Sequence, residues 1–298
     1  MISQISYKET PVVELFSPEL DKAAIRLLVK REDMNHPSVS GNKWWKLSPN
    51  LDEAIRLGHE VVLTFGGAYS NHIHATAAAA RAAGLRSIGI VRGERVKPLN
   101  PTLSFAEECG MVLHFVTRSD YSLKKTLPFL NNLKERFGEF FLIPEGGTNE
   151  LAVRSVTTFG LKLMNEVEFD VACLPVGTGG TLAGLIRAFQ DEREVMGFST
   201  LKGGAFLEQE VNGLFAGKMY NRWSIEVAYH FGGYGKTTQE LRDFILNQRL
   251  HHNLPLDPVY TGKMMFGIWD LISKGVFHRG TTLLAIHTGG LQGRMSAE

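Results

Sequence analysis

The chain has 298 residues, with 44% hydrophobic and 21% charged residues and a formal net charge of +1. This composition is ordinary for a globular protein, and a chain of this length commonly folds as two domains. Lys and Arg are spread without long runs, so neither a nucleic acid nor a membrane surface is an expected partner. No apolar run reaches about 18 residues and no signal pattern opens the chain, so we expect no membrane span and a cytoplasmic location.

Strand-like and helix-like segments alternate along the chain. The first half predicts strands at 25–30, 61–65, 87–91 and 112–116, and helices at 44–57, at 70–83 and from about 101. The second half predicts strands at 140–143, 171–176, 195–198 and 283–286, and helices near 151–167, 181–190, 237–250 and 264–274. Continuous apolar strands that alternate with helices are typical of an α/β fold, in which helices cover both faces of parallel or mixed sheets.

The number of strands favours a two-domain organisation. About eight or nine strands are more than we expect in one sheet of a chain this long. We place a smaller α/β domain at 45–148 and a larger, cofactor-binding domain at 1–44 and 149–298.

A glycine-rich segment, VGTGGTLAG at 176–184, follows a predicted strand and opens a predicted helix. Its glycines allow a sharp turn that presents several N–H groups, and Thr178 and Thr181 add hydroxyl donors. No Lys follows as in a P-loop, and the next strand does not end in the acidic residue of a dinucleotide site. The segment therefore predicts a site for a single phosphate monoester, and the alternative is a tight turn without a ligand.

Lys43 lies in the aromatic segment SGNKWWKL at 40–47. Apolar surroundings disfavour the charged ammonium, so the amine is more easily neutral and nucleophilic, which suits a Schiff-base lysine. The alternative is a solvated surface lysine, and that is what we expect of Lys46.

A third segment, FGGAYSNH at 65–72, joins a predicted strand to a predicted helix. Ser70 is a good helix N-cap, and polar side chains at a helix start are also good donors to a bound carboxylate. The alternative is simple capping by Ser70, with His72 and His74 in solvent. The ten His residues show no metal-ligand spacing, so we expect no metal site.

Two further segments lie near the C-terminus. In DPVYTGK at 257–263, Tyr260 is held on a short turn between Pro258 and Gly262, where it is either an acid–base group or half-buried packing. HTGG at 287–290 follows an apolar strand, and ligands gather at the carboxyl ends of parallel strands.

Together and in this order, these segments resemble the fold-type II pyridoxal phosphate enzymes, which have a tryptophan synthase β-like fold. Within them the chain is similar to the group of D-cysteine desulfhydrases and 1-aminocyclopropane-1-carboxylate deaminases. The segments that carry the resemblance are SGNKWWKL, FGGAYSNH, VGTGGT, LKGG at 201–204, GGYGKTT at 232–238, DPVYTGK and HTGG. The likeness runs from about residue 24 to residue 293.

The resemblance implies pyridoxal 5′-phosphate as cofactor, bound as a Schiff base to Lys43, which would also be the base at the substrate Cα. Asn71 would hydrogen-bond the 3′ oxygen of the pyridine ring, and Ser70 would bind the substrate carboxylate. The other implied site residues are Gly177, Thr178, Gly179, Gly180 and Thr181 at the phosphate, the active-site tyrosines Tyr234 and Tyr260, and Thr261 and Thr288 near the pyridine nitrogen.

Thr261 decides between the two reactions of the group. The deaminases carry Glu at this place, which keeps the pyridine nitrogen protonated and the ring a strong electron sink. A neutral hydroxyl favours the less demanding reaction, β-elimination from D-cysteine to pyruvate, hydrogen sulfide and ammonia. The alternatives are the deaminase reaction and, more remotely, a phosphate- or nucleotide-binding protein without Schiff-base chemistry. We expect a small amino acid as substrate and a homodimer as the assembly.

Overall fold

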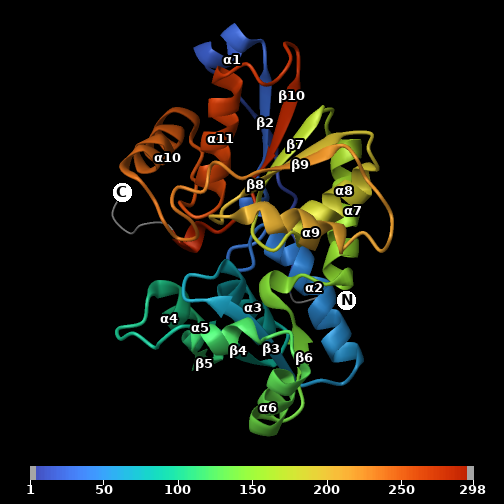
Figure 1. Ribbon diagram of the computed structural model, residues 1–298, viewed down its shortest axis with the longest axis vertical. Helices are drawn as coiled ribbons and strands as arrows, with labels where there is room; N and C mark the ends of the chain where they lie inside the picture. Colours follow the sequence, from blue (N-terminus) through green and yellow to red (C-terminus); the bar gives the residue numbers. More distant parts are fainter. Residues whose placement is uncertain (1–4, 294–298) are drawn as a thin grey trace.

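The computed structural model describes residues 5–293, which form two separate sheets (Figure 1). The larger sheet has six strands in the order β1-β2-β10-β7-β8-β9, and β1 is antiparallel to β2 while the other neighbours are parallel. These strands are β1 (Val12–Leu15), β2 (Arg26–Lys30), β7 (Val171–Val176), β8 (Glu194–Ser199), β9 (Trp223–Glu226) and β10 (Thr282–Ile286).

Helices cover both faces of the larger sheet. One face packs against α7 (Glu150–Glu166) and α8 (Gly180–Phe189), and the other packs against α1 (Pro18–Ala23) and α11 (Thr261–Ser273), with α10 (Gln239–His252) outside α11 (Figure 1). Every residue of β7, VACLPV, is therefore buried, which explains why this strand is apolar throughout instead of alternating.

The smaller sheet has four parallel strands in the order β5-β4-β3-β6. They are β3 (Val61–Gly67), β4 (Arg86–Arg92), β5 (Val112–Val116) and β6 (Phe141–Ile143). The covering helices are α2 (Asn42–Arg56), α3 (Asn71–Ala82), α4 (Pro101–Glu108), α5 (Arg118–Ser122) and α6 (Leu127–Phe137).

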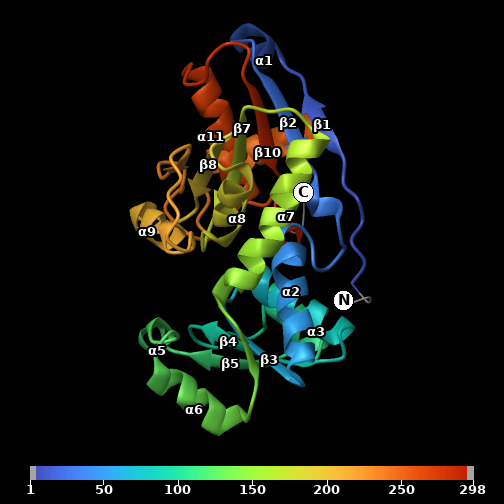
Figure 2. The ribbon, with the colours of Figure 1, turned by 90° about the vertical axis from the view of Figure 1, so that its right-hand side faces the viewer.

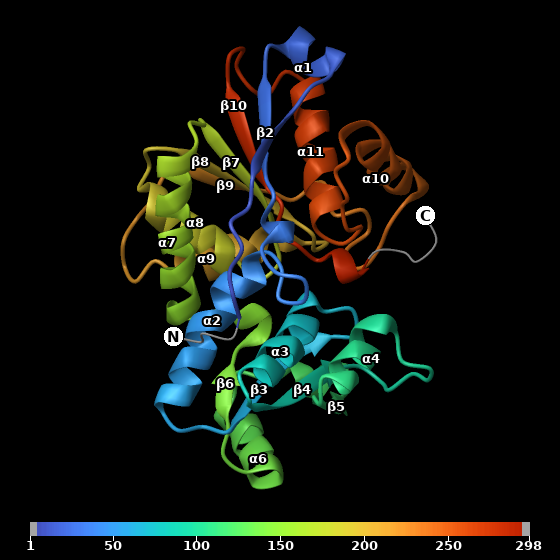
Figure 3. The same ribbon diagram turned by 180° about the vertical axis from the view of Figure 1, so that it is seen from behind.

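Helix α2 connects the two halves of the molecule. It packs against α7 beside the larger sheet and against α3 beside the smaller one, and it runs from one half into the other (Figures 2 and 3). The boundary that we expect between residues 44 and 45 thus falls inside a helix. The domain limits stay a prediction.

The α/β fold with mixed and parallel sheets and helices on both faces is confirmed. The predicted helices at 44–57 and 70–83 correspond to α2 and α3, and Gly58 and Gly84 follow their ends with positive φ angles of 77° and 71°. Several short elements were not predicted, among them β1, β9, α5, α6 and α9 (Leu207–Asn212). Between residues 5 and 293, no helix is both long and apolar enough to cross a lipid bilayer.

Candidate active site

A cavity of about 510 Å³ lies where the two halves of the molecule meet. The loops at its walls follow the carboxyl ends of β3, β7 and β10, the edge at which parallel sheets collect ligands. Most of the predicted site residues line it, namely Lys43, Ser70, Asn71, Gly177, Thr178, Gly179, Thr181, Tyr234, Tyr260 and Thr288. Gly180 and Thr261 are not in this lining. The residues come from distant segments, so only the fold brings them together.

The glycine-rich loop between β7 and α8 fits a phosphate group. Gly179, with φ at 78°, is the N-cap of α8, and no side chain caps the free N–H groups of this helix end. A Cβ on Gly179 would lie 2.6 Å from Val211 Cγ2, and one on Gly180 would lie 2.7 Å from Thr148 Oγ1. Only glycine therefore allows the chain to turn this tightly beside the cavity.

Lys46 is not the solvated surface residue that we expected. Its side chain is only 2% exposed, and its Nζ donates to the Gly146 carbonyl and to Thr148 Oγ1, both at 3.0 Å. Helix α2 packs against the segment 144–149, and the side of α2 that carries Lys46 forms part of the cavity wall together with this segment. Burial, and then the neighbouring Lys43, hold the pKa of Lys46 well below its usual value. Gly180 lies close by, since a Cβ there would be 3.1 Å from Lys46 Nζ.

Lys43 lies in the first turn of α2. Its Nζ donates to Asn42 Oδ1 at 2.8 Å, and Asn42 Nδ2 donates to Thr181 Oγ1 at 2.9 Å, so one asparagine joins the lysine to the glycine-rich loop. Burial lowers the pKa of Lys43 to about 8, although the negative charge of Asp257 opposes this effect. The amine is consequently neutral, and nucleophilic, at a lower pH than an ordinary lysine.

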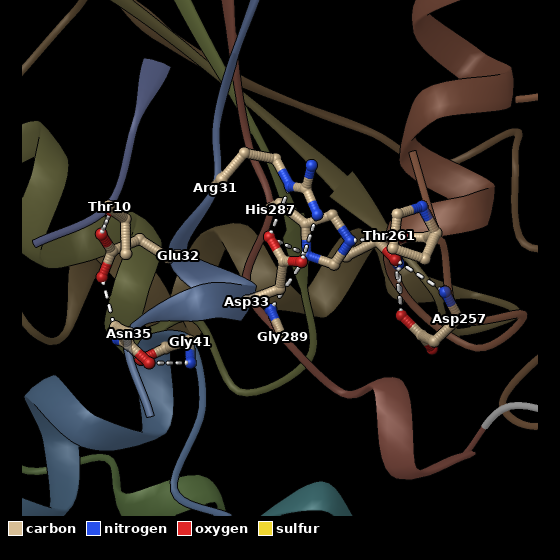
Figure 4. Close-up of polar contacts among 11 residues, drawn as sticks. Thr10, Arg31, Glu32, Asp33, Asn35, Gly41, Asp257, Thr261, His287 and Gly289 are labelled. Carbon is tan, nitrogen blue, oxygen red and sulfur yellow. Dashed lines mark hydrogen bonds and ion pairs between the residues drawn. The ribbon is translucent and has the colours of Figure 1, made fainter. Parts of the chain in front are cut away.

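A buried polar network fixes the backbone just before Lys43 (Figure 4). The Glu32 carboxylate accepts hydrogen bonds from Tyr7, Thr10, Asn35 and Trp45. Asn35 in turn binds both backbone groups of Gly41, since its Oδ1 accepts from the N–H at 2.8 Å and its Nδ2 donates to the carbonyl at 3.1 Å.

A second group in the same view supports the HTGG turn (Figure 4). Arg31 donates two hydrogen bonds of 2.8 Å to the buried Asp33, whose carboxylate lies 3.6 Å from His287 Nδ1. His287 also bonds the Pro255 carbonyl through Nε2 and accepts from the Gly289 N–H through Nδ1. The turn that carries Thr288 is therefore tied to the end of β2.

The start of α3 forms another wall of the cavity. Ser70 is the N-cap, and its Oγ accepts from the Ile73 N–H at 3.3 Å. His72 is buried instead of solvated: its Nε2 pairs with Thr64 Oγ1 at 2.7 Å, and its Nδ1 finds no partner among residues 5–293. Burial and the nearby lysines hold the pKa of His72 well below its usual value, so the ring is neutral. His74 is buried as well, with its ring stacked on Phe105.

Tyr234 and Tyr260 lie together, with ring centroids 6.0 Å apart. Burial raises the pKa of both phenols. At Tyr234 the positive charge of Arg92 opposes this effect in part.

Comparison with known proteins shows which family the chain belongs to. The family model described as pyridoxal-phosphate dependent enzyme matches residues 4–289. The chain belongs to the pyridoxal-phosphate dependent enzymes. The match covers nearly the whole chain, so the remote alternative without this cofactor is wrong.

Relatives of this pyridoxal-phosphate dependent enzyme show which members of the family it resembles. The chain is 31% identical to a putative 1-aminocyclopropane-1-carboxylate deaminase of Pyrococcus horikoshii, over 96% of this chain and 90% of that one. It is 29% identical to a mitochondrial bifunctional D-cysteine desulfhydrase/1-aminocyclopropane-1-carboxylate deaminase of Arabidopsis thaliana, over 97% of this chain and 78% of that one. The crystal structure of an ACC deaminase homologue superposes with a TM-score of 0.81 at 28% identity, covering 98% of this chain and 93% of that one. The fold-type II architecture is thus established.

The cavity fits the cofactor of this family. A phosphate would find free helix N–H groups and Lys46 at the glycine-rich loop, and a carbonyl group would find the amine of Lys43. The volume is also in the range of about 300–1,000 Å³ that is usual for ligand pockets.

The structure does not bring Thr261 to this cavity. Thr261 is fully buried, and its hydroxyl donates to Asp257 Oδ1 at 2.7 Å and accepts from the Asp257 N–H at 3.0 Å. Thr288, the second candidate, lines the cavity. In the sequence Asp257 stands only four residues before Thr261, near enough for the two side chains to bond each other.

Proposed function

We propose that this enzyme is a D-cysteine desulfhydrase, which converts D-cysteine and water to pyruvate, hydrogen sulfide and ammonia. The observation that carries the proposal is that Thr288, a hydroxyl residue, lines the cavity where the ring nitrogen of the cofactor would lie. Asp257 is the carboxylate near this wall, and both of its oxygens are already occupied by donors from residues 259–261. A hydroxyl, and not a carboxylate, would therefore face the ring nitrogen of the cofactor.

The chain's own residues would hold the cofactor at both ends. The glycine-rich loop from Gly177 to Thr181, together with Lys46, would bind the phosphate, and Lys43 would bind the carbonyl carbon covalently. When bound, pyridoxal phosphate withdraws the electron pair that remains when the substrate Cα loses its proton. Lys43, with its lowered pKa, would accept this proton.

The other cavity residues would orient the substrate and move a second proton. Ser70 and the N–H groups at the start of α3 would bind the substrate carboxylate, since this helix end favours negative charge. Tyr234 and Tyr260 would donate a proton to the departing sulfur when the Cβ–S bond breaks. The product then leaves as neutral hydrogen sulfide, while water replaces the nitrogen in the remaining three-carbon product.

The electron demand of the reaction favours elimination over ring opening. In β-elimination the negative charge at Cα lasts only until the sulfur leaves, so a weak electron sink is enough. Opening of the cyclopropane ring requires a deeper sink, which a carboxylate at the ring nitrogen would provide. The deaminase reaction remains the second candidate, because relatives that cover nearly the whole chain carry that name.

A direct comparison of substrates tests the proposal. The cofactor-saturated enzyme is incubated with D-cysteine, L-cysteine and 1-aminocyclopropane-1-carboxylate, and the release of 2-oxo acid and sulfide is measured. We expect D-cysteine to be consumed fastest and Lys43→Ala to be inactive on all three. Faster release of 2-oxobutanoate from the cyclopropane substrate would establish the deaminase instead. The homodimer stays a prediction.

A further inference from the structure

A hydrogen bond joins the first residue of α3 to the C-terminal end of the described chain. Gln292 Nε2 donates to Asn71 Oδ1 at 2.6 Å, although the two residues are 221 positions apart. Gln292 lies in the short 3₁₀ helix η4 (Leu291–Gly293), directly after the HTGG turn that follows β10. The contact therefore reaches from the end of the larger sheet to a helix of the smaller half.

This bond determines which way the Asn71 amide faces. An asparagine amide has a donor nitrogen and an acceptor oxygen, and a rotation of about 180° exchanges their places. Because Gln292 occupies the oxygen with a donor, the nitrogen is the atom that remains for another partner. Within the described part of the chain, no protein acceptor binds Asn71 Nδ2, and Asn71 lines the cavity.

Gly290 makes room for this arrangement. A Cβ on Gly290 would overlap Asn71 Nδ2, and Gly290 has a φ angle of 92°, in the region that favours glycine. The turn thus places a residue without a side chain under the amide nitrogen and a donor side chain on the amide oxygen. Gly290 gives the amide its room, and the donor from Gln292 selects its orientation.

We propose that Gln292 is a positioning residue that fixes Asn71 with its N–H donor directed at the bound cofactor. The inference rests on the proposed placement of Asn71 beside the 3′ oxygen of the ring, and it does not depend on which substrate the enzyme uses. That oxygen is a hydrogen-bond acceptor and is easily ionised, so it requires a donor. Without Gln292 the amide is free to present its oxygen instead, which an ionised acceptor would repel.

The experiment removes the donor while it keeps the size of the side chain. Gln292→Met and Gln292→Glu are compared with the parent enzyme for the dissociation constant of pyridoxal phosphate and for the midpoint pH of the absorbance change of the bound cofactor. We expect Gln292→Met to weaken binding by about three- to tenfold, the effect of one hydrogen bond, and to raise the midpoint pH. Gln292→Glu should do more, because a carboxylate can only accept and would attract the amide nitrogen away from the cofactor.

A double-mutant cycle separates positioning from a general structural effect. In an Asn71→Ala background, Gln292→Met should change the dissociation constant by less than about twofold. Gln239→Met, on the exposed side of α10, is the matched control and should change nothing. An equal loss in both backgrounds, or an unchanged midpoint pH in both Gln292 variants, would overturn the proposal. A failure of the desulfhydrase assignment would appear only with substrate and would leave these results unaffected.

Discussion

The amine of Lys43 should react at a lower pH than that of an ordinary lysine. Covalent capture of pyridoxal phosphate requires the neutral amine, and burial lowers the pKa of Lys43 to about 8. The capture rate of the cofactor-free enzyme should therefore rise with pH and level off above about pH 9, whereas a solvated lysine, with a pKa of about 10.4, would still be gaining rate there. Stopped-flow absorbance measures this pH profile.

Borohydride reduction and peptide mapping identify the lysine that binds the cofactor. We expect the pyridoxyl group on Lys43, and its appearance on Lys46 would contradict the assignment.

Lys46 should act on the phosphate and not on the carbonyl end of the cofactor. Its Nζ lies at the glycine-rich loop, and burial there lowers the pKa of the amine. A bound phosphate dianion would again favour the protonated, positively charged form of this amine. We expect Lys46→Met to weaken binding of pyridoxal phosphate by at least about tenfold, as one charge-assisted hydrogen bond is lost. Titration of the variant with pyridoxal, which lacks the phosphate, is the control and should give the parent affinity. An equal loss with both ligands would place Lys46 elsewhere.

At the scale of single residues, the sequence predicts what is locally encoded. The N-cap role of Ser70 and the sharp turn at Gly179 follow from residue type and position alone. The burial of Lys46 does not, because its partners Gly146 and Thr148 are about a hundred residues away. Thr261 is a different case, because its partner Asp257 is only four residues away in the sequence. The sequence does not show which side chains of this turn face the cavity, since that depends on how α11 packs.

The entry into α2 depends on the absence of a side chain at Gly41. This residue has a φ angle of 68°, and a Cβ there would overlap the backbone carbonyl of Thr288. Neither backbone can move easily, since Asn35 binds both polar groups of Gly41 and the His287 N–H, next to Thr288, donates to the Lys30 carbonyl of β2. We expect Gly41→Ala to lower the free energy of unfolding by more than about 3 kcal/mol.

Gly58, after the end of α2, is a matched control for this prediction. Its φ angle of 77° is similar, but a Cβ there would meet nothing within 4 Å. Gly58→Ala should therefore cost only the strain of the left-handed conformation, about 1 kcal/mol. Denaturant unfolding of both variants measures the difference. Equal destabilisation would show that the contact with Thr288 contributes nothing.

At the scale of elements, segments that are apolar along their whole length are predictable, whereas β1 and β9, the edge strands of the larger sheet, are not. The apolar strand β7 and the alanine-rich helix α3 lie where expected, because burial requires an apolar sequence along their length. Strands β1 and β9 have four residues each and form the two edges of the larger sheet. Each of them is half exposed and interrupted by polar or charged residues, so its four residues carry too little pattern to reveal it.

At the scale of the whole molecule, positive charge is concentrated in the cavity. The chain has a net charge of only +1, yet its cavity is lined by five cationic side chains and two carboxylates: Lys43, Lys46, Arg92, Lys124 and Lys125, with Glu145 and Glu210. Each carboxylate pairs with a neighbouring lysine, Glu145 with Lys124 at 3.4 Å and Glu210 with Lys125 at 3.2 Å. Arg92 and the protonated fraction of Lys43 remain, and their positive charge creates a field that attracts an anionic cofactor from a distance.

This field should make cofactor association depend on salt. Raising the salt concentration from about 0.01 M to about 1 M shortens the screening length from about 30 Å to about 3 Å. The association rate of pyridoxal phosphate should fall by at least about threefold over this range, while that of pyridoxal should hardly change.

Arg92→Leu removes a permanently charged cavity cation and should lower both the association rate at low salt and the salt dependence of this rate. Arg136→Leu removes the same charge from α6, outside the cavity lining, and should have a smaller effect. If both arginine variants lower the rate equally, overall charge attracts the cofactor and the cavity has no special part in it.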